Sequence, residues 1–330
     1  MAKPKDAHFH SWKQTLTEVV ENWNRHGASS QSAALAFYTI FSLAPVLVVV
    51  IALAGAFFGE EAVSGQIFAE FEGMMGPQAA LLVQEVLKSA AQPESGRIAT
   101  LLGLGTLLFG ATAVFVQLQD ALNRVWGVAP KPGAVFTTLL RKRLLSFAVL
   151  LSVGFLLVVS LVLSAALSAL SSRLEALLHL QLGLLQLMNF LISLFVITLL
   201  FALIYRLLPD VRLDGRDVLL GALATSLLFV LGKTAIGYYL GRTSVASAYG
   251  AAGSLVIVLL WVYYSSLIFF FGAELTWVHS KVHRDRQAPP EDGAMHVPEE
   301  LAGASAPTPE TLEKVAKEKG VRWRTWRKHS

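Results

Sequence analysis

Long apolar runs fill most of this chain, and charged residues are confined to the short stretches between them. Six runs are long enough to cross a bilayer, because a hydrocarbon core of roughly 30 Å needs about 20 residues of helix. Inside lipid a helix pairs its own backbone groups, so we expect helix even where Val, Ile and Phe are frequent. The pattern predicts an all-α, polytopic membrane protein with six transmembrane helices, at residues 33–58, 98–125, 142–170, 182–206, 217–240 and 253–279.

Positive charge is distributed unevenly between the two sides that this topology defines. Cytoplasmic loops of membrane proteins collect Lys and Arg. With the N-terminus inside, 22 of the 27 Lys and Arg residues lie on the cytoplasmic side, four lie outside, and Lys233 lies within a span. The external segment 59–97 carries six Glu residues. We therefore predict a multi-pass protein of the cell inner membrane with both termini in the cytoplasm.

The chain divides into three parts. Residues 1–30 form a cytoplasmic N-terminal segment, 31–281 the transmembrane domain, and 282–330 a largely mobile basic tail. Within the first part, apolar residues recur at helical spacing over 11–25, which predicts an amphipathic helix that lies at the cytoplasmic interface and enters the first span through Gly27. These apolar residues are Trp12, Leu16, Val19 or Val20, and Trp23.

Two further stretches lie outside the spans. Pro77 suits the first turn of a helix, so we predict a helix on the outer rim of the bundle that includes Leu81, Leu82, Val86 and Leu87. The tail ends in the basic and aromatic run VRWRTWRK at 321–328. Such a run either contacts anionic lipid, at about 1 kcal/mol per basic residue, or is simply a solvated face, and both interpretations fit.

Composition agrees with the membrane assignment and narrows the function. The chain is 54% hydrophobic and 15% charged, whereas an average soluble domain is about 25% charged. It has no Cys, which excludes disulfides, thiolate metal sites and cysteine nucleophiles. It also lacks the GxxxxGK[ST] and HExxH motifs and any His and carboxylate cluster at metal-ligand spacing. We therefore expect no enzyme activity, catalytic residue, metal or cofactor, and no nucleic-acid partner.

Lys233 is the most conspicuous polar residue inside a span. It lies about 16 residues into the fifth span, roughly 24 Å from the cytoplasmic end. Its long stem could carry the ammonium outward to the interface, which is a purely structural interpretation. Alternatively, it contacts an ion or an anionic headgroup, because charges within spans commonly mark functional sites.

A second group of polar residues lies where the second and sixth spans end on the cytoplasmic side. Asp120 and Arg124 are spaced for an i,i+4 pair and share a face with Gln117. We expect this face to point into the bundle near Glu274, either as a structural clamp or as part of a substrate route. The depths of Glu274 and Lys233 differ by well over 10 Å, so these two should not pair. The candidate cavity or substrate-route residues here are Gln117, Asp120, Asn123, Arg124, Lys233 and Glu274.

The first span contributes three more candidates for the same cavity. Tyr38 and Ser42 add a stripe of hydroxyl groups, and Pro45 is expected to kink the helix because it removes a backbone hydrogen bond. Kinks of this kind occur in transporters and in static bundles alike.

Several motifs in order along the chain resemble the YihY/virulence factor BrkB family of bacterial inner-membrane proteins. They are SAALAFYTIFSLAP at 32–45, QDALNRVW at 119–126, YRLLPD at 205–210, YG at 249–250, Trp261, and GAEL at 272–275. The resemblance covers residues 15–280 and implies a six-helix inner-membrane protein. Members of that family have been linked to serum resistance and to movement of envelope lipids, and some carried the label ribonuclease BN. The basic tail departs from the family pattern.

Three functions follow, in order of preference. The first is a transporter or translocator of envelope lipid or an anionic amphiphile, in which the intramembrane polar groups line a cavity and membrane lipids are the partners; a homo-oligomer is compatible with this. The second is a non-transporting scaffold that organises envelope partners through its tail. The third, ribonuclease, has no support from the residues. Substrate, coupling ion and direction of transport are not encoded in any recognisable motif.

Overall fold

The computed structural model describes residues 12–90, 113–130, 182–242, 249–284, 289–290 and 294–297. The predicted span 142–170 and the first half of the span 98–125 lie outside these residues. The elements are α1 (Trp12–His26), α2 (Ala28–Phe58), α3 (Glu60–Met75), α4 (Pro77–Ala90), a helical segment at 113–125, β1 (Val128–Pro130), α7 (Leu182–Leu207), α8 (Gly215–Arg242), a 3-10 turn (Gly250–Ala252), α10 (Gly253–Arg284) and β2 (Ala294–His296).

Three of the described helices are long and apolar enough to cross a membrane. They are α7, α8 and α10, and their bounds lie within about five residues of the predicted spans 182–206, 217–240 and 253–279. The predicted span 33–58 lies within α2, which has no Asp, Glu, Lys or Arg and continues as a helix through Pro45. The described part of the molecule is therefore a bundle of long apolar helices.

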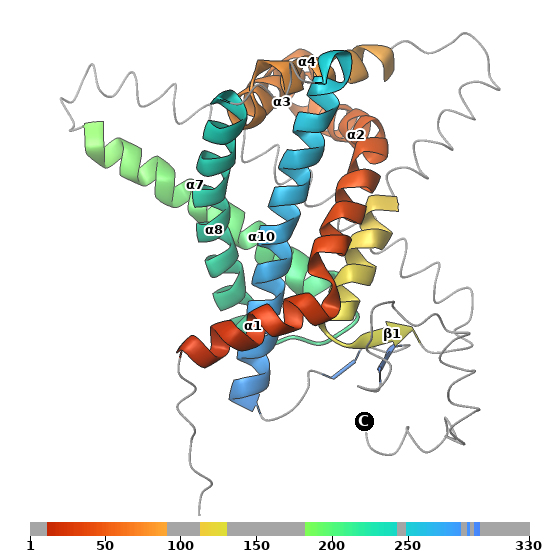
Figure 1. Ribbon diagram of the computed structural model, residues 1–330. Coiled ribbons are helices and arrows are strands. Elements are labelled where there is room, and N and C mark those ends of the chain that lie inside the picture. Colours follow the sequence, from red (N-terminus) through yellow and green to blue (C-terminus); the bar gives the residue numbers. More distant parts are fainter. Residues whose placement is uncertain are drawn as a thin grey trace, which may run out of the picture.

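The long helices run alongside one another, and the shorter ones lie across the two ends of the bundle (Figure 1). α10 packs against both α8 and α2, and α7 packs against α8 at a pronounced tilt. α1 crosses the end at which α2 begins and α10 finishes. α3 and α4 cover the opposite end, where α2 finishes and α10 begins. We refer to these as the α1 end and the α3 end.

α1 confirms the amphipathic helix that the spacing predicts. Val19 is fully buried against Leu275 and Val278 of α10, and the Trp23 ring meets Phe271 edge-on with centroids 5.5 Å apart. Leu16 and Val20, on the flank of the same stripe, remain exposed. Gly27 adopts a left-handed conformation with φ of 66°, which glycine tolerates without steric cost. This single residue turns the chain from α1 into α2.

Close packing of α8 against α10 depends on two glycines. A Cβ on Gly221 would overlap Thr276, and one on Gly272 would overlap Thr225 and crowd the Tyr205 hydroxyl. Small residues let helix backbones approach closely, which replaces the missing hydrophobic drive between helices in a membrane. Thr225 and Thr276 donate their hydroxyl protons to carbonyls one turn earlier in their own helices. The hydroxyl groups of both threonines are therefore paired at this close approach.

The α3 end contains one predicted helix and one unpredicted helix. α4 begins at Pro77 as predicted, but its buried positions are Ala79, Ala80 and Val83, and Leu81 of the predicted apolar set is 56% exposed. α3 precedes it without a signal that we recognised. Its Val63 and Ile67 pack with Val83 and with Leu47 of α2. The two helices thus form a cap on the bundle.

Part of the tail is attached to the α1 end. β2 pairs antiparallel with β1, the Val297 amide donates to the Gly127 carbonyl, and the Arg212 amide donates to the Pro289 carbonyl. The segment 282–330, which we predicted to be largely mobile, therefore contributes residues 289–290 and 294–297 to the fold.

Candidate functional site

Buried and half-buried polar side chains gather at the α1 end, where α1, α2, α8, α10 and the helical segment 113–125 meet. They form pairs between elements: His26 with Glu274, Gln31 with Gln117, Asn123 with Asp210, and Asp217 with His279. We call these eight residues the α1-end polar cluster. The apolar core between the same helices holds Leu122, Tyr205 and Phe270, all almost fully buried.

The shortest contact of the cluster joins α1 to α10. His26 Nδ1 lies 2.7 Å from Glu274 Oε1, with the Glu274 side chain fully buried and the His26 side chain 10% exposed. The turn at Gly27 places His26 at this point, and its ring also meets Trp277 edge-on. The second oxygen, Glu274 Oε2, is buried with no hydrogen-bond partner among the described residues. A carboxyl group in this position can be held by the imidazole and can also carry a proton.

Two polar pairs connect the helical segment 113–125 to its neighbours. Asn123 donates from Nδ2 to Asp210 Oδ2 at 3.1 Å and accepts at Oδ1 from the Asp210 amide at 2.8 Å. Both residues are buried. One turn and a half earlier, Gln117 Nε2 donates to Gln31 Oε1 at 2.8 Å. Buried polar groups cost free energy unless paired, so these bonds fix the positions of three chain segments.

Two further polar contacts lie on the α8 side. His279 Nε2 is 3.9 Å from Asp217 Oδ1 near the start of α8. The buried Tyr205 hydroxyl donates to the Phe269 carbonyl at 2.7 Å and lies 3.0 Å from Thr225 Oγ1. These contacts fasten α7, α8 and α10 to one another just inside the cluster.

The structure brings together some of the sequence-predicted residues and separates others. Gln117, Asn123 and Glu274 belong to the cluster, and each finds a partner that we did not predict. Asp120 interacts electrostatically with Arg124, as the i,i+4 spacing indicated. Asp120 itself is exposed, whereas Gln117 of the same predicted face reaches Gln31. Asn123, which lies outside that face, reaches Asp210.

The remaining candidates lie away from the cluster. On α2, Tyr38 is 38% exposed and Ser42 is buried, and Pro45 lies one turn beyond Ser42. Lys233 is half-buried on α8, four residues before Gly237, where a Cβ would lie 3.4 Å from the Met74 carbonyl of α3. It makes no pair with Glu274, in agreement with the difference in depth that the sequence indicated.

Sequence reasoning missed five members of the cluster: His26, Gln31, Asp210, Asp217 and His279. His26 and Glu274 are 248 positions apart, and no local pattern connects them. Asp210 could have been found, because it closes the YRLLPD motif. Among the described residues, no group of three or more His, Asp or Glu is arranged to hold a metal ion.

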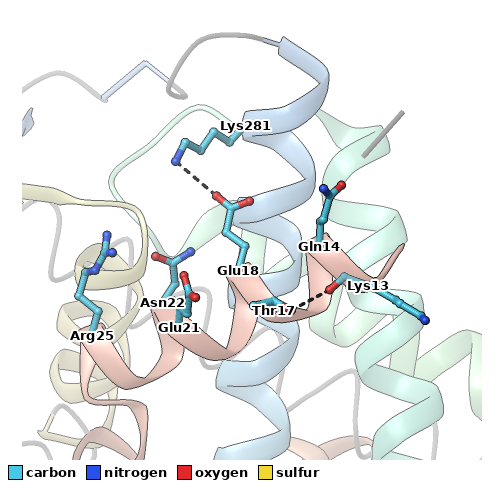
Figure 2. A pocket seen from close by; sticks show the side chains of 8 residues that line it. All are labelled: Lys13, Gln14, Thr17, Glu18, Glu21, Asn22, Arg25 and Lys281. Atoms are coloured by element: carbon cyan, nitrogen blue, oxygen red, sulfur yellow. Dashed lines mark hydrogen bonds and ion pairs between the residues drawn. The ribbon is translucent and has the colours of Figure 1, made fainter. Parts of the chain in front are cut away.

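A shallow, open pocket of about 540 Å³ covers the polar face of α1 (Figure 2). Lys281 of α10 reaches across it to Glu18, with 3.5 Å between Nζ and Oε1. The lining mixes both signs of charge and therefore has no strong preference for an anion or a cation. It consists of Lys13, Gln14, Thr17, Glu18, Glu21, Asn22, Arg25 and Lys281.

Comparison with known proteins gives consistent matches. The family model described as virulence factor BrkB matches residues 19–295. The chain is 28% identical over 275 residues to a UPF0761 membrane protein of Alcanivorax borkumensis, covering 82% of this chain and 62% of that protein. It is 31% identical over 274 residues to one from Pseudomonas paraeruginosa, covering 81% and 63%. It is 29% identical over 254 residues to one from Psychromonas ingrahamii, covering 73% and 79%.

The chain spans less than two thirds of the length of the first two of these relatives. No solved structure matches.

Proposed function

Because the chain belongs to the virulence factor BrkB family of integral membrane proteins, as its motifs indicated, we propose that it translocates an envelope lipid or a related anionic amphiphile across the inner membrane. One observation carries this proposal, namely the α1-end polar cluster, which includes the fully buried carboxyl group of Glu274. Ionisable groups buried in a membrane protein are costly and are commonly retained for substrate or proton pathways.

We place the α1 end in the cytoplasm, with both termini on that side. The unequal distribution of Lys and Arg supports this orientation. So does the first turn of α3, at the opposite end, which carries Glu60 and Glu61. In this orientation the cluster lies at the cytoplasmic ends of the helices, and Lys233 lies toward the external leaflet.

The arrangement suggests how the cytoplasmic end could open. α1 is joined to α2 by a single left-handed glycine and is held to α10 by the His26–Glu274 contact and by apolar packing. Release of that contact would free α1 to swing about Gly27 and expose the cluster to lipid headgroups. Protonation of Glu274 is one way to weaken it, because the imidazole then loses its charged partner.

Single substitutions test this function. Lys233→Met, Asp120→Leu and Glu274→Gln are expected to disturb the distribution of lipids between the leaflets of the envelope, while the protein stays in the membrane. Lys88→Met is the matched control, because Lys88 is exposed on α4 and is not one of the candidate route residues. Lipid asymmetry in cells that express each variant is the measurement. Wild-type asymmetry in all three variants would contradict the proposal.

The same cells separate translocation from the scaffold alternative. A scaffold that works through the tail should lose function on truncation, whereas a translocator should largely keep it. The cut belongs after Val297, because residues 289–297 include contacts with β1 and Arg212. A deletion from residue 286 would also remove these contacts. A loss of function would then not distinguish a damaged fold from the loss of a scaffold. Loss of function in the 1–297 chain at normal abundance would favour the scaffold.

A further inference from the structure

Two apolar residues of α1 are left exposed although the helix packs on the bundle. Leu16 and Val20 are 41% and 49% exposed, and because they are four positions apart they lie on one side of the helix. The other exposed side chains of α1 are polar. We call Leu16 and Val20 the apolar flank of α1. An apolar flank beside a polar exposed surface indicates contact with an apolar medium or partner.

The contacts of the residues just before Val20 fix the direction in which the apolar flank faces. Glu18, Val19 and Val20 follow one another around α1 in steps of about 100°. Glu18 reaches Lys281, near the end of α10 (Figure 2). Val19 packs with Leu275, which is six residues nearer the middle of α10. One further step in the same sense brings Val20 to the side of α1 that faces the α3 end, away from Glu18.

The depth at which α1 crosses α10 is close to the edge of the hydrocarbon core. The apolar stretch of α10 has 29 residues, from Gly253 to Lys281, and is about 43 Å long, whereas the core is roughly 30 Å thick. Placed symmetrically, it extends about 6 Å, or four residues, beyond the core at each end. Lys281 then lies outside the core and Leu275 inside it. Phe271, which the Trp23 ring meets edge-on, lies deeper still.

The neighbouring surface of α8 is apolar and exposed as well. Ala224 packs against the cluster that contains Val19 and Leu275. Leu220 and Leu227, four positions before and three after Ala224, share its helix face and are 40% and 42% exposed. Since α8 is long and apolar enough to cross a membrane, this face is suited to lipid. The apolar flank of α1 therefore adjoins a surface of the same kind.

We propose that the apolar flank of α1 is embedded among the acyl chains of the leaflet at the α1 end, with the Glu18–Lys281 side toward water. α1 is in this case an in-plane membrane helix. A swing about Gly27 carries it along the leaflet, because movement into the water would expose Leu16 and Val20. The direction of the swing rests on the proposed function, whereas the embedding needs only a bundle that spans the membrane.

Site-specific fluorescence quenching tests the embedding in the purified full chain, which has no native Cys, after reconstitution into vesicles of phosphatidylethanolamine and phosphatidylglycerol. Leu16→Cys and Val20→Cys carry a polarity-sensitive label on the apolar flank. Glu21→Cys, at the exposed neighbour of Val20, is the matched control. The two flank labels are expected to emit at shorter wavelength than the control and to lose most of their emission when the lipids carry an acyl-chain nitroxide. Aqueous iodide should quench only the control.

Each outcome decides the proposal. Nitroxide quenching at both flank positions, without quenching of Glu21→Cys, supports the embedding. Iodide quenching of the flank labels would place them in water and overturn it. Resistance to both quenchers would show that protein, from this chain or a second copy, covers the flank, and would overturn the assignment to lipid.

The direction of movement has its own test in the labelled Val20→Cys chain. Glu274→Gln, which mimics the protonated carboxyl group, is added to it. Nitroxide quenching should persist if α1 stays in the leaflet, and a change to iodide quenching would show that α1 leaves it. Normal lipid asymmetry in the functional variants described above would refute translocation and leave the embedding unaffected.

Discussion

Replacing His26 by leucine is expected to destabilise the bundle by about 3–5 kcal/mol, because it removes the partner of a fully buried carboxylate. The cost comes from the buried carboxyl group that is left without its partner rather than from the strength of the lost contact. The matched control is Glu18→Leu, which breaks another contact between α1 and α10. That contact, to Lys281, is exposed and 3.5 Å long, and exposed pairs contribute about 0–1 kcal/mol. Thermal unfolding of the purified protein in detergent measures both variants.

A double variant separates this explanation from simple loss of packing. In His26→Leu/Glu274→Leu no buried carboxyl group remains without a partner, and replacing both members of a buried pair by apolar residues is often nearly neutral. The double variant is therefore expected to be more stable than His26→Leu alone. A His26→Leu variant that unfolds at the same temperature as Glu18→Leu would show that the buried contact does not hold α1 to α10.

Gly272→Ala is expected to destabilise the α8–α10 seam by about 1–3 kcal/mol, the usual cost of overpacking. The added methyl group would overlap Thr225, which is fully buried and is tied to the Gly221 carbonyl by a 2.7 Å hydrogen bond. Tyr205 closes the other side and donates to the Phe269 carbonyl. Neither neighbour can move without breaking a buried hydrogen bond. The unfolding temperature of the purified variant measures the effect.

Two further variants give this prediction its controls. Gly65→Ala changes a glycine in α3 whose added Cβ would have nothing within 4 Å, so it should be neutral or slightly stabilising through helix propensity. Thr225→Ala introduced together with Gly272→Ala removes the overlapping group and should recover part of the loss. A Gly272→Ala variant as stable as Gly65→Ala would contradict the close approach of the two helices.

The apolar pattern predicted the long helices because their lengths and limits depend on local sequence. The bounds of α7, α8 and α10 follow the predicted spans closely, and α1 follows from the spacing of Val19 and Trp23 with Trp12 and Leu16. α3 was missed because its Glu residues lie among apolar ones in the expected external loop, with no clear periodicity. A helix that lies across the end of a bundle, as α3 does, buries only one side. A few apolar residues within a largely polar sequence are enough to form that side.

The polar pairs were harder to predict because each joins positions that are distant in sequence. Sequence spacing indicated that Glu274 needed a partner other than Lys233, but only the turn at Gly27 places His26 beside it. Local spacing gave the orientation of the segment 113–125 only in part. Of the residues that share the predicted face, Gln117 contacts Gln31 of α2 while Asp120 is exposed. A second contact is made by Asn123, whose partner lies 87 positions away. Rotation of a helix depends on its neighbours, and those are not visible in its own sequence.

Single-cysteine labelling tests most directly whether the α1-end polar cluster lies at the cytoplasmic face of a bundle that spans the membrane. The chain has no native Cys, so any introduced thiol is the only one to react. Glu61→Cys on α3 and Arg216→Cys at the start of α8 are both exposed positions at opposite ends. A maleimide that cannot cross the inner membrane should label Glu61→Cys in intact cells and Arg216→Cys only after that membrane is opened. Labelling of Arg216→Cys in intact cells would contradict the account.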